Sequence, residues 1–113
     1  MTNLTFAAAV DIAAAISAGT VSSREITQHY IDRIESLDTT VNAVCVRLFE
    51  HALQAAEEAD RRQAKGESLG PLHGVPMSIK ESYVHANTPA TWGIPAYRDN
   101  IAAADGLAVA RFK

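Results

Sequence analysis

The sequence predicts a helix-rich chain that also contains at least one β-strand, with the helices in the first half and the strand in the second. In the first half, apolar residues recur at spacings of three and four, as in helices that bury one face. In the second half, residues 75–80 alternate in character between segments rich in proline and glycine, as in a short strand. The 113 residues include 21 alanines but only three Phe, three Tyr and one Trp, which predicts a thin core for this length.

The first helix is expected to end at Gly19 and to present an apolar face made of Phe6, Val10, Ala13 and Ile16. The second is expected to begin at Ser22, because a serine followed three residues later by a glutamate, Glu25, is the capping-box pattern. Its apolar stripe is Ile26, Tyr30, Ile34 and Leu37, and the pattern breaks at residues 38–40. A third helix is expected from about Phe49 to Lys65.

Between the second and third helices, residues 44–48 alternate briefly, which predicts a short strand or an extended connector. The clearer strand candidate is residues 75–80, where Val75, Met77 and Ile79 would face one side and Lys80 the other. Because Pro76 has no N–H to donate, it is expected at the start of that strand. A last helix is expected to begin at Asp105, a good N-cap residue.

Composition and charge exclude several classes of protein. A net charge of −3 and a pI of about 5.7 disfavour binding to nucleic-acid phosphates. The lone cysteine, Cys45, excludes an internal disulfide, and its apolar neighbours predict a buried, inert thiol. The four histidines are scattered, so no metal site is expected. Without a membrane-length apolar run or a basic leader, the expected location is the cytoplasm.

Lys80 is the main candidate for chemistry, because it follows an apolar strand and a rigid loop of glycine and proline. Desolvation lowers the pKa of a lysine and allows it to act as a general base. The alternative is a surface lysine whose stem covers apolar neighbours, or one that is paired with Glu81. Spacing alone leaves both interpretations open.

The segment GPLHGVPMSIKES (residues 70–82), preceded by ALQAAEEAD and followed by TPATWG, resembles the N-terminal part of the amidase signature family. The resemblance extends over essentially all 113 residues in the order of the family. It implies an α/β domain with a central mixed sheet flanked by helices. Residues 1–66 would form a helical layer, and residues 67–113 would form the strand that carries the catalytic lysine, a loop and the start of a helix.

The same resemblance implies a hydrolase of carbon–nitrogen bonds in small amides, without a metal or organic cofactor. Its catalytic set is a nucleophilic serine, a second serine in a cis peptide, and a lysine that corresponds to Lys80. Trp92 falls in a loop near the active-site cleft, where it borders the substrate channel or simply packs. His73 and the loop glycines are expected to be structural, and Asn87 stands where relatives often have glycine.

Both serines of the family lie downstream of position 113, and neither Ser78 nor Ser82 occupies a family serine position. The chain is therefore expected to be a truncated amidase fragment that is inactive alone. Two alternatives stay open: a non-catalytic interaction fragment that self-associates or pairs with a complementing fragment, and the transamidating amidotransferase subunit of the same family. No contact with nucleic acid or with a membrane is expected from the sequence itself.

Overall fold

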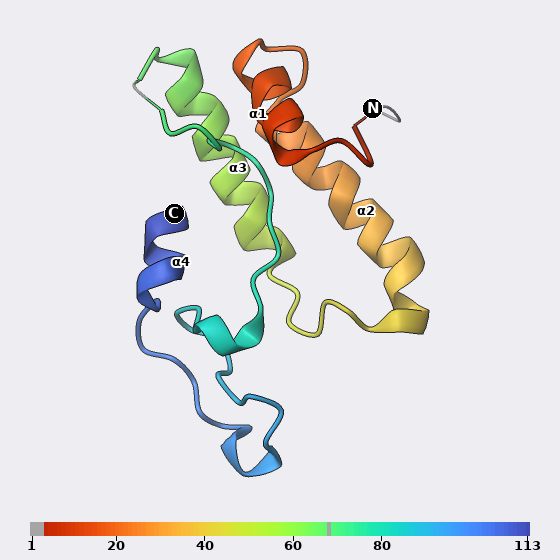
Figure 1. Ribbon diagram of the computed structural model, residues 1–113, viewed down its shortest axis with the longest axis vertical. Helices are drawn as coiled ribbons and strands as arrows, with labels where there is room; N and C mark the ends of the chain where they lie inside the picture. Colours follow the sequence, from red (N-terminus) through yellow and green to blue (C-terminus); the bar gives the residue numbers. More distant parts are fainter. Residues whose placement is uncertain (1–3, 68) are drawn as a thin grey trace. The chain divides into compact units, whose positions relative to one another are not determined.

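The computed structural model describes residues 4–67 and 69–113, and the chain divides into two compact units, residues 1–76 and 77–113 (Figure 1). The first unit contains three helices: α1 (Ala9–Ser17), α2 (Ser23–Val41) and α3 (Phe49–Ala64). The second contains two short 3₁₀ helices, η1 (Glu81–Tyr83) and η2 (Pro95–Tyr97), and one α-helix, α4 (Leu107–Phe112). The three helices expected in the first half are confirmed.

The expected sheet is wrong: the described residues are helical and contain no β-strand, so the α/β class with a central mixed sheet does not hold. Residues 75–80 and 44–48 are both non-helical segments without a paired neighbour. A strand exists only where a second strand accepts its hydrogen bonds. Here the N–H of Val75 donates to the carbonyl of Leu72 in a turn, at 3.1 Å, and Pro76 has no N–H.

The nearest approach to a sheet among the described residues is one isolated antiparallel bridge, between Pro89 and Ile101 in the second unit. Around it, the N–H of Asn87 donates to the carbonyl of Ala102 at 2.8 Å, and the N–H of Ala102 donates to Thr88 at 3.0 Å. Because a proline sits in the middle of this pairing, one donor of a longer ladder is missing.

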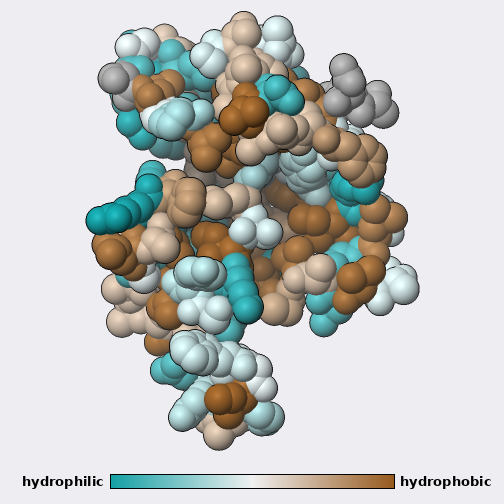
Figure 2. All heavy atoms as spheres, viewed as in Figure 1, coloured by the Kyte–Doolittle hydropathy of each residue, from teal (hydrophilic) through white to brown (hydrophobic). Residues whose placement is uncertain are grey.

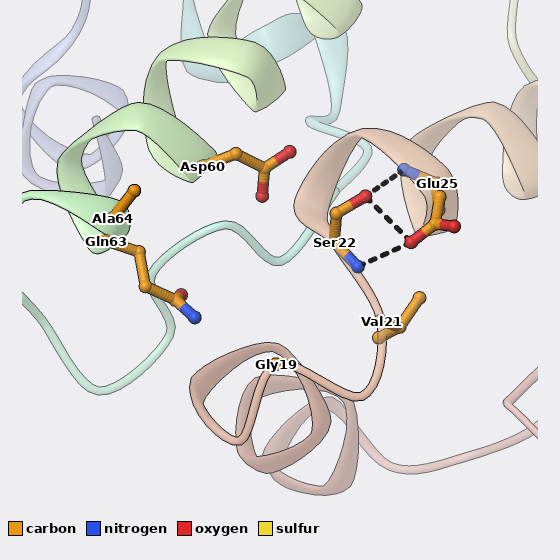
Figure 3. A pocket seen from close by; sticks show the side chains of 7 residues that line it. All are labelled: Gly19, Val21, Ser22, Glu25, Asp60, Gln63 and Ala64. Carbon is orange, nitrogen blue, oxygen red and sulfur yellow. Dashed lines mark hydrogen bonds between the residues drawn. The ribbon is translucent and has the colours of Figure 1, made fainter.

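The start of α2 is held by two carboxylates from different helices. The Ser22 hydroxyl accepts from the N–H of Glu25 at 3.0 Å, and the Glu25 carboxylate accepts from the N–H of Ser22 at 2.8 Å, which confirms the capping box (Figure 3). Asp60 of α3 adds a second cap, since it accepts from the N–H of Ser23 at 2.7 Å and of Arg24 at 3.0 Å. The α2 and α3 helices are thus joined at this end.

The end of α2 lies at Val41, beyond the predicted break at residues 38–40, and Asn42 then adopts a left-handed φ of 51°. Asp38 explains the extension, because its buried carboxylate accepts from the N–H of Ala43 at 2.6 Å and of Val44 at 3.1 Å. The bond from Ala43 is the main reason that the pKa of Asp38 lies below its usual value. The polar side chain that seemed to break the helix fastens its exit.

The core of the first unit is centred on four buried residues, and partly buried side chains including Tyr30 and Val75 pack against it. The four are Ile12, Ile16, Val21 and Ile26. The predicted apolar face of the first helix is therefore wrong except at Ile16: Phe6 is 85% exposed and Val10 is 67% exposed. Phe6 precedes the helix and lies under the guanidinium of Arg33, at 5.0 Å from the ring centroid.

The last helix also begins differently from the prediction. Its N-cap is Gly106, not Asp105, and no side chain caps it. The Asp105 carboxylate instead accepts from the N–H of Ala86 at 2.8 Å and pairs with the ammonium of Lys113 at 2.7 Å. The N–H of Gly106 donates to the carbonyl of Val84 at 2.9 Å, which ties the start of α4 to the end of η1.

Candidate functional site

The glycine- and proline-rich loop of the motif is fixed to the helices of the first unit. The Ser23 hydroxyl donates to the carbonyl of Gly74 at 2.6 Å, and the ring Nε2 of His73 lies 2.9 Å from the carbonyl oxygen of Ala59. Gly74 has a φ of 76°, a left-handed conformation that favours glycine. These contacts give Gly74 and His73 places in the packing of the loop.

Lys80 lies in the second unit, directly before η1, where its carbonyl accepts from the N–H of Tyr83 at 2.9 Å. Its side chain is exposed, and its ammonium has no ion pair or hydrogen bond with any described residue. The described residues therefore neither neutralise nor desolvate it. The Lys80–Glu81 pair considered from the sequence does not form, because the Glu81 carboxylate is directed to a different part of the chain.

Glu81 accepts hydrogen bonds from two consecutive backbone amides. The N–H groups of Thr91 and Trp92 each donate to one of its carboxylate oxygens, the second at 2.9 Å. These bonds, led by the one from Thr91, hold the pKa of Glu81 below its ordinary value. The residue after Lys80 is thereby connected to the segment that carries Trp92.

Residues 91–94 form a tight turn in which Trp92 and Gly93 have φ values of 54° and 72°. The N–H of Ile94 closes the turn by donating to the carbonyl of Thr91 at 2.9 Å. Positive φ at both central positions is typical of a type I′ turn, in which glycine or asparagine is the usual first residue. A tryptophan there is unusual, and its side chain is 70% exposed.

The structure thus places the two predicted site residues, Lys80 and Trp92, on segments that one carboxylate links. Sequence reasoning missed this role of Glu81, since nothing in a local pattern shows that a carboxylate bonds to amides ten residues away. Asn87, at the position where relatives often have glycine, has a φ of 62° and so adopts a glycine-like backbone.

The remaining candidates have simpler surroundings. Ser78 is exposed, and Ser82 lies in η1, so the expectation that both share a strand face with Lys80 is wrong. Cys45 is exposed, contrary to the predicted burial, because residues 44–48 run along the surface instead of entering a core. Within residues 4–67 and 69–113, no three His, Cys, Asp or Glu side chains gather to hold a metal, and no helix has the length and apolarity to cross a membrane.

A hollow of about 350 Å³ lies in the first unit, between the start of α2 and the end of α3 (Figure 3). Its acidic side chains are Glu25 and Asp60, the two carboxylates that cap α2. Since both accept backbone N–H groups, they are part of the helix junction and leave the hollow without a free charged group for a ligand.

Comparisons with known proteins agree with the motif. A family model described as Amidase matches residues 25–113. The indoleacetamide hydrolase of Bradyrhizobium diazoefficiens is 44% identical over 93% of this chain and 20% of its own length. The acylamidase of Rhodococcus erythropolis is 34% identical over 98% of this chain and 23% of its own. A glutamyl-tRNA(Gln) amidotransferase subunit of Bdellovibrio bacteriovorus is 38% identical over 98% and 22%.

The chain therefore belongs to the amidase family. It spans about a fifth of the length of these relatives, and the matched range, residues 25–113, includes the lysine motif and the Trp92 turn.

Proposed function

We propose that the protein serves as the lysine-bearing part of an amidase that hydrolyses carbon–nitrogen bonds of small amides. The observation that carries the proposal is the family match over residues 25–113, which includes the segment GPLHGVPMSIK ending at Lys80. Lys80 would be the base, and Trp92 would border the substrate. Two of the relatives named above are, by name, an indoleacetamide hydrolase and an acylamidase.

The proposed mechanism follows the family resemblance. The neutral amine of Lys80 accepts a proton through a bridging serine, and the nucleophilic serine attacks the amide carbonyl to form an acyl-enzyme. Backbone N–H groups stabilise the oxyanion, the proton passes to the leaving amine, and water then releases the acid. Because Lys80 is exposed among the described residues, its desolvation is assigned to the polypeptide that contributes the serines.

The experiment is a chimera in which this chain replaces the aligned segment of the Bradyrhizobium indoleacetamide hydrolase, assayed for release of ammonia from indoleacetamide. The chimera should hydrolyse the amide, and Lys80→Ala should lower kcat by about 10²- to 10⁴-fold, the usual contribution of a general base. The chain alone should release no ammonia, since neither Ser78 nor Ser82 is proposed as a nucleophile.

The matched control is Lys65→Ala, which removes another exposed lysine at the end of α3. Both variants should keep the helical circular dichroism of the parent chimera. A chimera whose Lys80→Ala variant retains full activity would contradict the assignment of Lys80 as base. Amide hydrolysis by the isolated 113-residue chain would contradict the absence of a nucleophile.

A second candidate is the transamidating subunit of a glutamyl-tRNA(Gln) amidotransferase, because several relatives at 38–41% identity carry that name. The same exchange into the Bdellovibrio amidotransferase distinguishes the two. Restored formation of glutaminyl-tRNA, together with an inactive hydrolase chimera, would favour this candidate over the hydrolase.

A further inference from the structure

The turn at residues 91–94 combines three features that seldom occur together. A large aromatic residue, Trp92, has a φ of 54°, its side chain is 70% exposed, and both N–H groups at the start of the turn are bound by one side chain. A left-handed backbone costs a non-glycine residue about 1–2 kcal/mol, so the surrounding structure must hold it there. Burial of the indole does not supply that stabilisation, because the indole is exposed.

The Glu81 carboxylate supplies it through geometry that only a carboxylate provides. Its two oxygens accept one N–H each, from Thr91 and from Trp92. A glutamine of the same shape offers one oxygen and one NH₂ group, and the NH₂ would face an N–H donor. An aspartate has the two oxygens but is shorter by one methylene. The two amides therefore select a glutamate at this position.

Glu81 is also the residue directly after Lys80, and Lys80 is itself fixed by the bond from the N–H of Tyr83 to its carbonyl at 2.9 Å. Adjacent Cα atoms are about 3.8 Å apart, so the anchor of the Trp92 turn and the lysine share one short piece of backbone. A shift of the turn relative to that backbone would change where the indole lies with respect to the lysine segment.

We propose that Glu81 is a positioning residue, whose carboxylate fixes the turn at residues 91–94, and with it the Trp92 indole, to the backbone that carries Lys80. The inference rests on the proposed function for its consequence, which is that Glu81 sets the wall against which the acyl part of the amide lies. Glu81 itself touches neither the substrate nor the transferred proton.

The test uses the 113-residue chain labelled with ¹⁵N, because Thr91 and Trp92 have their own amide signals and the chain contains a single tryptophan. In Glu81→Gln, these two amides should move upfield and exchange with solvent about tenfold faster or more, since each loses a charge-assisted bond or its alignment. The fluorescence anisotropy of Trp92 should fall. Glu81→Asp should restore the two signals at most in part.

The matched control is Asp99→Asn, which removes an exposed carboxylate from the same unit without a side-chain hydrogen bond to any described residue. It should leave both amides and the anisotropy unchanged. The amides of Asn87 and Ala102, which bond within the second unit, report whether that unit stays folded. Unchanged Thr91 and Trp92 signals in Glu81→Gln, or equal changes in Asp99→Asn, would overturn the proposal.

If Glu81→Gln unfolds the unit, the unmodified chain decides. Its Thr91 and Trp92 amides should follow a carboxyl titration with a pKa below 4.5, the ordinary glutamate value, and their failure to titrate would overturn the proposal. Lys80→Ala should not alter these signals. A failed Glu81 test would therefore leave the hydrolysis test of Lys80 intact, and a failed hydrolysis test would leave the Glu81 bonds intact.

Discussion

At the scale of single residues, the motif loop depends on how closely Gly74 approaches Ser23. A Cβ added at Gly74 would lie 3.0 Å from the Cβ of Ser23 and 3.1 Å from its hydroxyl oxygen, and the φ of 76° already disfavours other residues. Gly70, in the same loop, has open space around the equivalent position and no positive φ. The two glycines of one motif therefore meet different constraints.

We predict that Gly74→Ala destabilises the first unit by about 2 kcal/mol, from backbone strain together with the close contact. Gly70→Ala should change stability by less than about 0.5 kcal/mol, or raise it slightly by restricting the unfolded chain. Urea unfolding followed by far-ultraviolet circular dichroism measures both. Equal losses in the two variants would show that contact with Ser23 does not constrain this loop.

At the scale of elements, the start of α2 is the best-defined junction. Ser22→Ala removes the hydroxyl that accepts from the N–H of Glu25 at 3.0 Å, and should cost about 1 kcal/mol. Ser36→Ala is the control within α2: the Ser36 hydroxyl donates to the carbonyl of Arg33 at 2.9 Å, on an exposed surface of the helix. That control should be neutral or slightly stabilising. A Ser22→Ala loss no larger than that of Ser36→Ala would contradict the capping role.

The helices could be predicted from the sequence because their signals are local. The capping box at Ser22 and the glycine stops at Gly19 and Gly66 act within a few residues of themselves. The strand could not, because residues 75–80 carry a strand pattern but strand formation depends on a partner elsewhere. The predicted faces also failed in part, since Leu37 is 53% exposed while Ile31 is buried.

The site divides along the same line. Lys80 and Trp92 were chosen from residue type and from a family motif, and their roles are predictions. The link between their segments depends on the side chain of Glu81 reaching amides that follow it by ten and eleven residues. Asp38, Asp60 and Asp105 also bond to backbone N–H groups outside their own helical turn. Such bonds follow from tertiary placement, which no local spacing encodes.

At the scale of the whole molecule, carboxylates that accept backbone N–H groups fasten both units. The pKa is lowered, first by a backbone hydrogen bond in each case, at Glu25, Asp38, Glu81 and Asp105. A carboxyl whose pKa is lower when folded contributes stability above its unfolded value, and that stability is lost as the pH falls through the folded value.

We therefore predict that stability is independent of these groups near pH 7 and declines below about pH 4.5, as the carboxylates become protonated. Urea midpoints measured between pH 7 and pH 3 test this. Helical circular dichroism reports mainly the first unit, and the fluorescence of the single tryptophan reports the second. Asp38→Asn should weaken the acid dependence of the helical signal alone. Stability that rises as the pH falls from 5 to 3 would contradict the account.

Large apolar side chains are exposed in both units, and Figure 2 shows apolar residues spread over the visible face. In the first unit they include Val10, Leu37 and Val41, and in the second they include Trp92, Leu107 and Phe112. Together with the small set of fully buried residues, this agrees with the thin core that the alanine content predicts.

The central claim is that this chain supplies the base of an amidase, and the most direct measurement is the kcat of the hydrolase chimera with and without the amine of Lys80. The account predicts ammonia release from indoleacetamide by the parent chimera and by Lys65→Ala, and a loss of about 10²- to 10⁴-fold in Lys80→Ala. Equal rates in Lys80→Ala and Lys65→Ala, with both proteins folded, would contradict it.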